Sequence, residues 1–156
     1  MEAKLAPPAA LPARAGFLLA QLGRAAIRSF SDALAPTGLK PPHTAVLVQL
    51  RARGAMTQQA LGDVLGKDPS NLVALLNDLE EAGLAVRRRD PDDRRRHIVE
   101  LSRRGAARLE DAERALAAAQ DELLAGLDED ERAELERLLT RAARASGTAA
   151  GWCHGD

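Results

Sequence analysis

The stretch RRRDPDDRRRHIVEL, from Arg87 to Leu101, gathers the side chains of this 156-residue chain that are best suited to bind an anion. Six arginines flank three aspartates and a proline, and an alternating apolar stretch follows them. Guanidinium groups form strong, often paired hydrogen bonds with phosphates and carboxylates. Runs of charge are nevertheless more often solvated surface, so the elements around this stretch must decide what it does.

The charge of the chain is distributed unevenly, although its net value is only −1. Residues 84–108 contain nine arginines and four acidic residues, which gives a local charge of +5. Residues 109–156 contain five arginines and twelve acidic residues, which gives −7. A basic segment in a chain that is not broadly basic indicates a local anionic partner.

Two short helices are predicted before the basic stretch. Thr57 is a good N-cap for the first helix, and Gly66 closes it. The second helix opens with Asp68 as N-cap and Pro69 at its first helical position, and Gly83 stops it. The apolar stripe of this second helix consists of Leu72, Leu75, Leu76 and Leu79.

The basic stretch itself is predicted to form a hairpin, with strands at residues 84–89 and 97–102. Leu84 and Val86 are expected on one face of the first strand. Pro91 and the three aspartates suit the connecting turn. Two short helices followed by a hairpin with a basic tip form a winged helix-turn-helix, in which a helix enters the major groove of DNA and the hairpin reaches an adjacent groove.

The rest of the chain is predicted to be helical. Aromatic residues make up only 2% of it, and the dominance of Ala, Leu and Arg favours helix over sheet. Apolar residues at helical spacing predict helices over residues 11–34 and 41–54, a long helix after Ser102 and a final helix after Asp128. The chain is therefore expected to be mainly α with a small β-hairpin.

The second short helix is the candidate recognition helix. The face opposite its leucine stripe, with the positions that flank this face, carries the candidate DNA-binding residues Ser70, Asn71, Val73, Ala74 and Asn77. Asn can bind adenine through two hydrogen bonds, and small apolar groups can touch the methyl group of thymine. The helix contains no Arg or Lys, so the cationic contacts are expected from Arg87 to Arg89 and Arg94 to Arg96. The alternative is a buried amphipathic helix in an unrelated bundle.

The stretch MTQQALGDVLGKDPSNLVALLNDLEEAGLAVRRRDPDDRRRHIVELSRRG, from Met56 to Gly105, resembles the MarR family of bacterial transcriptional regulators. Its LEEAGL segment, the Asp-x-Arg of the hairpin (Asp93 and Arg95) and the Leu-Ser-x-x-Gly that opens the long helix match the family pattern closely. The flanking helices also fit, so the resemblance extends roughly over residues 11–145.

The resemblance implies a homodimer whose N-terminal and C-terminal helices interlock and whose two winged domains bind a palindromic site in double-stranded DNA. Two leucine stripes agree with this, because one small winged domain cannot cover both. They are Leu109, Leu116 and Leu123 on the long helix, and Leu135, Leu138 and Leu139 on the last helix. An intrachain helical hairpin is the alternative cover for these stripes.

The expected organisation is a winged helix-turn-helix plus long dimerisation helices. Residues 1–35 would form an N-terminal arm and dimerisation helix, and residues 36–102 the DNA-binding domain. Residues 103–147 would form the C-terminal dimerisation helices, followed by a flexible tail at 148–156.

The resemblance also assigns roles to the residues of the hairpin tip. Arg95 is similar to the family arginine that enters the minor groove, where a narrow A·T-rich groove attracts it. Asp93 would hold the wing arginines in place, and Arg94 and Arg96 would meet phosphates or brace the loop.

The recognition helix departs from the family pattern at three positions. Many members have Thr and Arg where this chain has Val73 and Ala74, and a basic residue is common at the position of Asp78. We therefore expect weaker phosphate anchoring by this helix and greater dependence on the wing.

Family members usually release DNA when they bind a small, often phenolic or anionic, effector between the dimerisation region and the DNA-binding lobe. The candidate lining residues here are Phe17, Arg24, Arg28, Phe30 and His43. Arg24 and Arg28 share a helix face and could pair with a carboxylate, although solvated or intersubunit positions are commoner for Arg. For His43, a half-buried structural role near the start of its helix is commoner than a ligand contact.

Other functions fit the sequence less well. Three scattered histidines, no tyrosine and no glycine-rich phosphate loop argue against an enzyme, and no cofactor or metal is expected. The single cysteine, Cys153, cannot form an intrachain disulfide, and no apolar run is long enough to span a bilayer, so a cytoplasmic protein without a membrane partner is expected. The competing function is a winged-helix module that binds protein instead of specific DNA.

Overall fold

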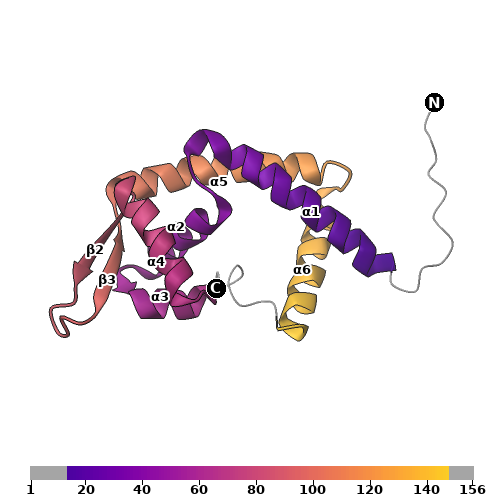
Figure 1. Ribbon diagram of the computed structural model, residues 1–156. Coiled ribbons are helices and arrows are strands. Elements are labelled where there is room, and N and C mark those ends of the chain that lie inside the picture. The colour runs from indigo at the N-terminus through magenta and orange to yellow at the C-terminus, as the bar shows by residue number, and fades with distance from the viewer. Residues whose placement is uncertain (1–13, 148–156) are drawn as a thin grey trace, which may run out of the picture.

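The structure, a computed structural model, describes residues 14–147, so the predicted N-terminal arm and C-terminal tail, with Cys153, lie largely or wholly outside the described residues. The described part contains six α-helices and a three-stranded antiparallel sheet (Figure 1). The elements are α1 (Arg14–Leu34), η1 (Ala35–Thr37), α2 (Pro41–Arg53), β1 (Met56–Thr57), α3 (Gln58–Leu65), α4 (Pro69–Glu81), β2 (Ala85–Arg89), β3 (His97–Leu101), α5 (Arg103–Leu123) and α6 (Glu129–Ala145).

The two short helices, α3 and α4, begin at the residues that the sequence predicts. The Thr57 hydroxyl oxygen accepts a hydrogen bond from the backbone N–H of Ala60 at 3.2 Å. The Asp68 carboxylate accepts one from the backbone N–H of Asn71 at 3.0 Å. Each side chain satisfies a backbone donor that the first turn of a helix leaves without an intrahelical partner. The predicted caps are therefore confirmed.

The sheet has the strand order β1-β3-β2, and it pairs Arg87 with Val99 and Ala85 with Leu101. This register shows that the predicted face of β2 was wrong. Ala85 is buried on the side of Val99, whereas Val86 is 49% exposed on the opposite side. The two-residue strand β1 was not predicted, because so short a strand is defined by its partner and not by its own pattern.

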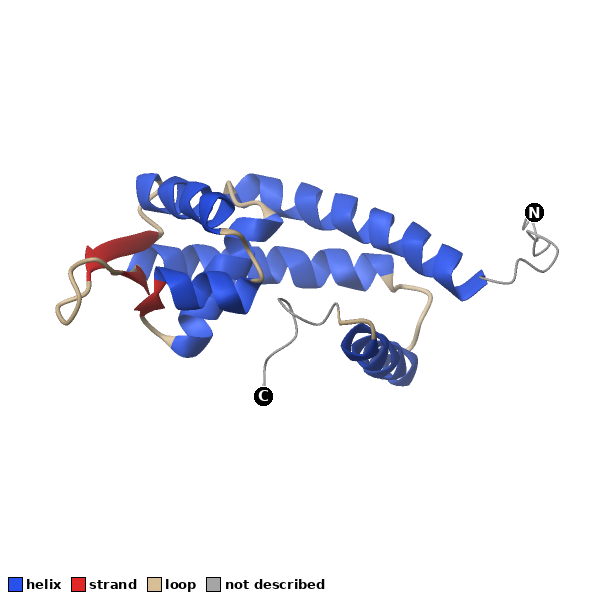
Figure 2. Cartoon of the chain, turned by 60° about the horizontal axis from the view of Figure 1, so that its bottom comes forward, coloured by secondary structure: helices blue, strands red, loops and turns tan. Residues whose placement is uncertain are grey.

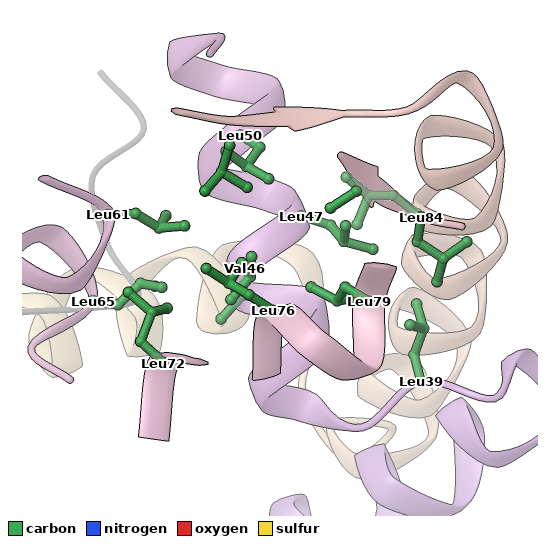
Figure 3. Close-up of a cluster of buried hydrophobic side chains, with 14 of the residues drawn as sticks. Leu39, Val46, Leu47, Leu50, Leu61, Leu65, Leu72, Leu76, Leu79 and Leu84 are labelled. Atoms are coloured by element: carbon green, nitrogen blue, oxygen red, sulfur yellow. The ribbon is translucent and has the colours of Figure 1, made fainter. Parts of the chain in front are cut away.

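A single apolar core joins the two short helices to α2, the sheet and the start of α5 (Figure 3). Leu72, Leu76 and Leu79 of α4 are buried in it, so the predicted stripe of the recognition helix is confirmed. Leu109 of α5 is fully buried in the same core and Leu116 packs against it. The expectation that the α5 stripe is left over for another surface was therefore wrong for these two leucines.

The start of α5 is fixed to the base of the hairpin by the Leu-Ser-x-x-Gly motif. The Ser102 hydroxyl donates to the carbonyl oxygen of Gly83 at 2.8 Å and accepts from the backbone N–H of Gly105 at 2.8 Å. The Ser102 backbone N–H donates to the Leu84 carbonyl oxygen at 3.1 Å. A side chain at position 105 would begin 2.0 Å from that same oxygen, so only glycine fits.

The long helices α1 and α5 pack along each other and extend away from the winged unit (Figure 2). Helix α6 turns away from the end of α5 and contains no buried residue. The amino-terminal half of α1 and the last turns of α6 expose large apolar side chains, namely Phe17, Leu18, Leu19, Leu22, Leu138 and Leu139. Within residues 14–147, no helix has the length and apolarity needed to cross a membrane.

Candidate nucleic-acid interface

The hairpin between β2 and β3 ends in a hydrogen-bonded loop, which we call the wing tip (residues 90–96). The Asp90 backbone N–H donates to the Arg96 carbonyl oxygen at 3.0 Å, and the Arg96 backbone N–H donates to the Asp93 carbonyl oxygen at 2.8 Å. The Asp90 carboxylate also accepts from the backbone N–H of Asp92 at 2.9 Å, which is a local Asx turn. The loop is therefore shaped by its aspartates, as its composition predicts.

Asp93 holds two of the wing-tip arginines. One oxygen of its carboxylate accepts from the backbone N–H of Arg95 at 3.0 Å and lies 3.2 Å from Nε of Arg95. The other oxygen lies 3.4 Å from Nε of Arg96. The backbone hydrogen bond from Arg95, then its side chain and the charge of Arg96, lower the pKa of Asp93 below its usual value. The carboxylate is therefore ionised at neutral pH and remains a partner for both arginines.

The wing-tip arginines carry their charge into solvent. The side chain of Arg95 is 92% exposed and that of Arg96 is 62% exposed. Arg94 is also exposed, and its carbonyl oxygen accepts from the guanidinium of Arg89 at 2.7 Å, which ties the tip to β2. Three successive cations thus stand at the end of a braced hairpin.

The other arginines of the hairpin contribute less free charge than the sequence indicates. Arg88 forms an ion pair with Glu100 across the two strands at 2.6 Å. Arg87 turns toward α4 and forms an ion pair with Glu80 at 2.6 Å. The cationic surface is therefore concentrated at the wing tip and does not extend along the whole hairpin.

Helix α4 presents its predicted outer face to solvent. Ser70, Asn71, Ala74 and Asn77 are exposed and Val73 is half-buried. The leucine stripe on the opposite side fixes this orientation by burial in the core. The structure therefore brings the candidate residues of α4 and of the wing tip to the surface of one winged unit.

A groove with a volume of about 420 Å³ separates the wing from α3 and the start of α4. Arg95 and Arg96 line one side of it, and Gln58, Gln59 and Lys67 line the other. Lys67 is a cation of this surface that the sequence analysis missed. Its position directly before the N-cap of α4 was the available signal, because a helix N-terminus attracts phosphate.

The five candidate effector residues do not share one pocket. Phe30 lines a cavity of about 320 Å³ between α1, α2 and α5. Arg28 lines a different hollow, between α1 and α5. Arg24 is exposed on α1, and Phe17 is exposed near the beginning of that helix.

The fifth candidate, His43, is buried and uses both of its ring nitrogens. Its Nδ1 accepts from the backbone N–H of Lys40 at 3.2 Å, so the proton of the neutral ring is on Nε2. Nε2 lies 3.2 Å from a carboxylate oxygen of Asp78 and donates to it. His43 thus joins the start of α2 to the recognition helix. Its partner Asp78 stands at the position where a basic residue is common in the family.

Comparison with known proteins gives the family of the chain. Residues 37–96 match the family model described as MarR family. A relative from Thauera aromatica, a putative transcriptional regulatory protein for the hcr operon, is 33% identical over 130 residues, which are 83% of this chain and 78% of the relative. The chain belongs to the MarR family. This family consists of transcriptional regulators, so the protein is a DNA-binding transcriptional regulator and not an enzyme.

Solved MarR-family structures show the same fold. A mutant MarR from E. coli complexed with operator DNA is 28% identical, with a TM-score of 0.73 over 85% of this chain and 94% of that one. CouR from Rhodococcus jostii RHA1, bound to p-coumaroyl-CoA, is 32% identical, with a TM-score of 0.71 over 86% of this chain and 95% of that one. The fold class predicted from the sequence is therefore confirmed.

Proposed function

We propose that this MarR-family protein is a homodimeric repressor that binds a palindromic operator and releases it when a small aromatic or anionic effector binds. The observation that carries the proposal is the braced wing tip, from which Arg95 and Arg96 line a groove that faces α3 and the start of the recognition helix. In this arrangement α4 enters the major groove and the wing tip reaches the adjacent minor groove, as in other winged helix proteins.

Each residue of this surface has a distinct role in the proposal. Arg95, whose side chain is 92% exposed, enters the minor groove. Arg94, Arg96 and Lys67 neutralise phosphates, and Asp93 braces the arginines without touching DNA. Base edges in the major groove are read by Ser70, Asn71, Val73, Ala74 and Asn77.

The uncovered apolar faces of α1 and α6 support the homodimer. Leu138 is 46% exposed, and α6 has no buried residue of its own. An intrachain helical hairpin would bury Leu138, so this alternative does not account for the leucines of α6. A second copy would cover the N-terminal half of α1 and α6 together, with residues 103–147 and the helix before residue 35 as the dimerisation region.

The cavity lined by Phe30 is the proposed effector site. Leu34, Pro41, Thr44 and Leu116 also line it, so it is mainly apolar and touches both the long helices and α2 of the winged unit. Its volume of about 320 Å³ lies within the range of sites for small molecules. CouR supports an aromatic acyl compound as the effector class, because that relative binds p-coumaroyl-CoA.

A gel shift with the DNA upstream of the protein's own gene tests binding and release together. We expect a specific complex whose affinity falls steeply with salt, because arginines that neutralise phosphates release counterions. Cinnamate, benzoate and their thioesters are then added, and release of the DNA supports the effector proposal. Binding that is weak and insensitive to salt would favour the alternative, a winged-helix module that binds protein.

The substitution Ala117→Phe isolates the effector cavity, because Ala117 lines it and does not line the groove beside the wing tip. The larger side chain should fill the cavity, leave operator affinity unchanged and abolish release by the aromatic acid. Release that is as efficient as in the wild-type protein would place the effector elsewhere.

A further inference from the structure

The guanidinium of Arg87 lies against the recognition helix α4, and its side chain is only 21% exposed. Nη2 donates to Oδ1 of Asn77 at 2.7 Å and lies 2.6 Å from Oε2 of Glu80. Nη1 donates to Oε1 of Gln58 on α3 at 3.4 Å. The Arg87 backbone N–H also donates to Oε1 of Glu80 at 3.1 Å. One residue of β2 thus fastens the wing to both helices of the helix-turn-helix.

This arrangement fixes the orientation of the Asn77 amide. A guanidinium has only donors, so the atom of Asn77 that faces Arg87 must be the carbonyl oxygen and not the NH2 group. The NH2 group is bonded to the same carbon and is therefore directed away from Arg87. Asn77 is exposed on α4, so at this position the helix presents the two N–H donors of the amide to a ligand.

An amide held in this way is poorly suited to adenine. The paired contact of Asn with adenine needs the carbonyl oxygen to accept from N6 while the NH2 group donates to N7. The hydrogen bond from Arg87 takes one of the two lone pairs of the Asn77 carbonyl oxygen and turns this oxygen toward Arg87, away from the position that N6 of an adenine needs. In the major groove guanine presents two neighbouring acceptors, O6 and N7, so a side chain that binds them needs only hydrogen-bond donors.

We propose that Arg87 is a positioning residue that makes Asn77 a donor-only reader of a G·C pair in each half-site. The proposal rests on the proposed function, in which α4 lies in the major groove. It replaces the adenine contact that the residue type alone indicates for Asn77. The charge of Arg87 is neutralised by Glu80, so its contribution to binding is the orientation of Asn77 and not a phosphate contact.

Selection of binding sites from randomised duplex DNA tests this directly, with the full-length protein and two variants of Asn77. Asn77→Ala identifies the base pair that depends on this side chain. Asn77→Asp keeps an oxygen acceptor for Arg87 but has no N–H donor. We expect a G·C pair at that position in the wild-type sites, and a roughly tenfold loss of preference for it in Asn77→Asp.

A lysine substitution separates positioning by Arg87 from its charge. Arg87→Lys keeps the charge but loses the fork that reaches Asn77, Glu80 and Gln58 together, so the preference at this position should relax although Asn77 is intact. Arg88→Lys is the matched control, because the neighbouring Arg88 pairs with Glu100 and not with α4. The control should retain the wild-type preference, and circular dichroism must show that each variant is folded.

Three results would overturn the proposal while leaving the proposed function intact: an A·T pair at the Asn77-dependent position, an unchanged preference in Asn77→Asp, or an unchanged preference in Arg87→Lys. Failure of the wild-type protein to select any sequence would instead overturn the proposed function, and this inference with it.

Discussion

Gly105 is the position where a single methyl group should disturb the structure most clearly. A Cβ atom built there lies 2.0 Å from the carbonyl oxygen of Leu84 and 2.9 Å from Cδ1 of Leu101. Ordinary contact begins at 3.4 Å, so in Gly105→Ala the start of α5 and the base of the hairpin must separate by about 1.4 Å. That separation also stretches the hydrogen bonds of Ser102 that join the two elements.

The expected cost follows from the rigidity of the neighbour. Overpacking a core costs roughly 1–3 kcal/mol, and the upper part of this range applies because the oxygen of Leu84 belongs to the backbone. The higher helix propensity of alanine returns at most about 1 kcal/mol. A net loss of about 2 kcal/mol corresponds to a decrease in Tm of roughly 4–8 °C for a chain of this size.

Thermal unfolding followed by circular dichroism, at one fixed protein concentration, measures this decrease. Gly126→Ala is the control, because a Cβ at that position meets no atom within 4 Å. The control should melt within about 2 °C of the wild-type protein, because its main effect is a small reduction in the conformational entropy of the unfolded chain. A Gly105→Ala variant that melts with the control would refute the close approach of α5 to Leu84.

Three further substitutions probe the wing and the proposed dimer. Arg95→Ala should weaken operator binding in a gel shift by about tenfold or more without changing the Tm, because its side chain is 92% exposed; unchanged affinity would contradict the minor-groove role. Asp93→Ala should also weaken operator binding. In the wild-type protein the contribution of Asp93 to operator affinity should be constant around neutral pH and be lost only on acidification. Folding lowers the pKa of Asp93, so its carboxylate holds the arginines at every pH above the usual pKa of Asp and lets go of them as the pH falls through the lower folded value. Operator affinity measured against pH checks this, and a loss of affinity near neutral pH would contradict it. Leu138→Asp should convert the dimer to monomer in sedimentation velocity, whereas Glu136→Asp, which is exposed on the same helix, should not.

Local chemistry made much of the fold predictable. The caps at Thr57 and Asp68 depend on side chains that bond to backbone groups three residues away, so the sequence contains all the information. The leucine stripe of α4 is set by helical period alone, and the aspartates of the wing tip form turns with their own neighbours.

The errors concern features that depend on a distant partner. Val86 is more apolar than Ala85, so the pattern placed it inside, but pairing of Ala85 with Leu101 decides the register and turns Val86 outward. Arg87 was assigned to the cationic surface by its residue type. Its ion pair with Glu80 and its hydrogen bond to Asn77 depend on the packing of β2 against α4, which the local sequence does not show. Each of these outcomes is fixed by contacts across elements.

The candidate effector residues illustrate the same limit. Phe30 lines the proposed cavity, but Leu116 and Ala117 of α5 complete it from a segment that is remote in sequence. His43 was a plausible ligand by residue type. Its burial and its bond to Asp78 depend on the packing of α2 against α4, which no local pattern shows.

The salt dependence of operator binding tests the central claim most directly. The full-length protein is titrated with labelled DNA from upstream of its own gene, and with a scrambled duplex of equal length, at several salt concentrations. We predict a specific complex of two chains per duplex. We also predict that the logarithm of the affinity falls linearly with the logarithm of the salt concentration, with a slope that becomes shallower by about two in Arg94→Ala, one phosphate contact for each wing. Equal affinity for the two duplexes, or a slope that Arg94→Ala leaves unchanged, would contradict a dimeric repressor that holds its operator through the wing tips.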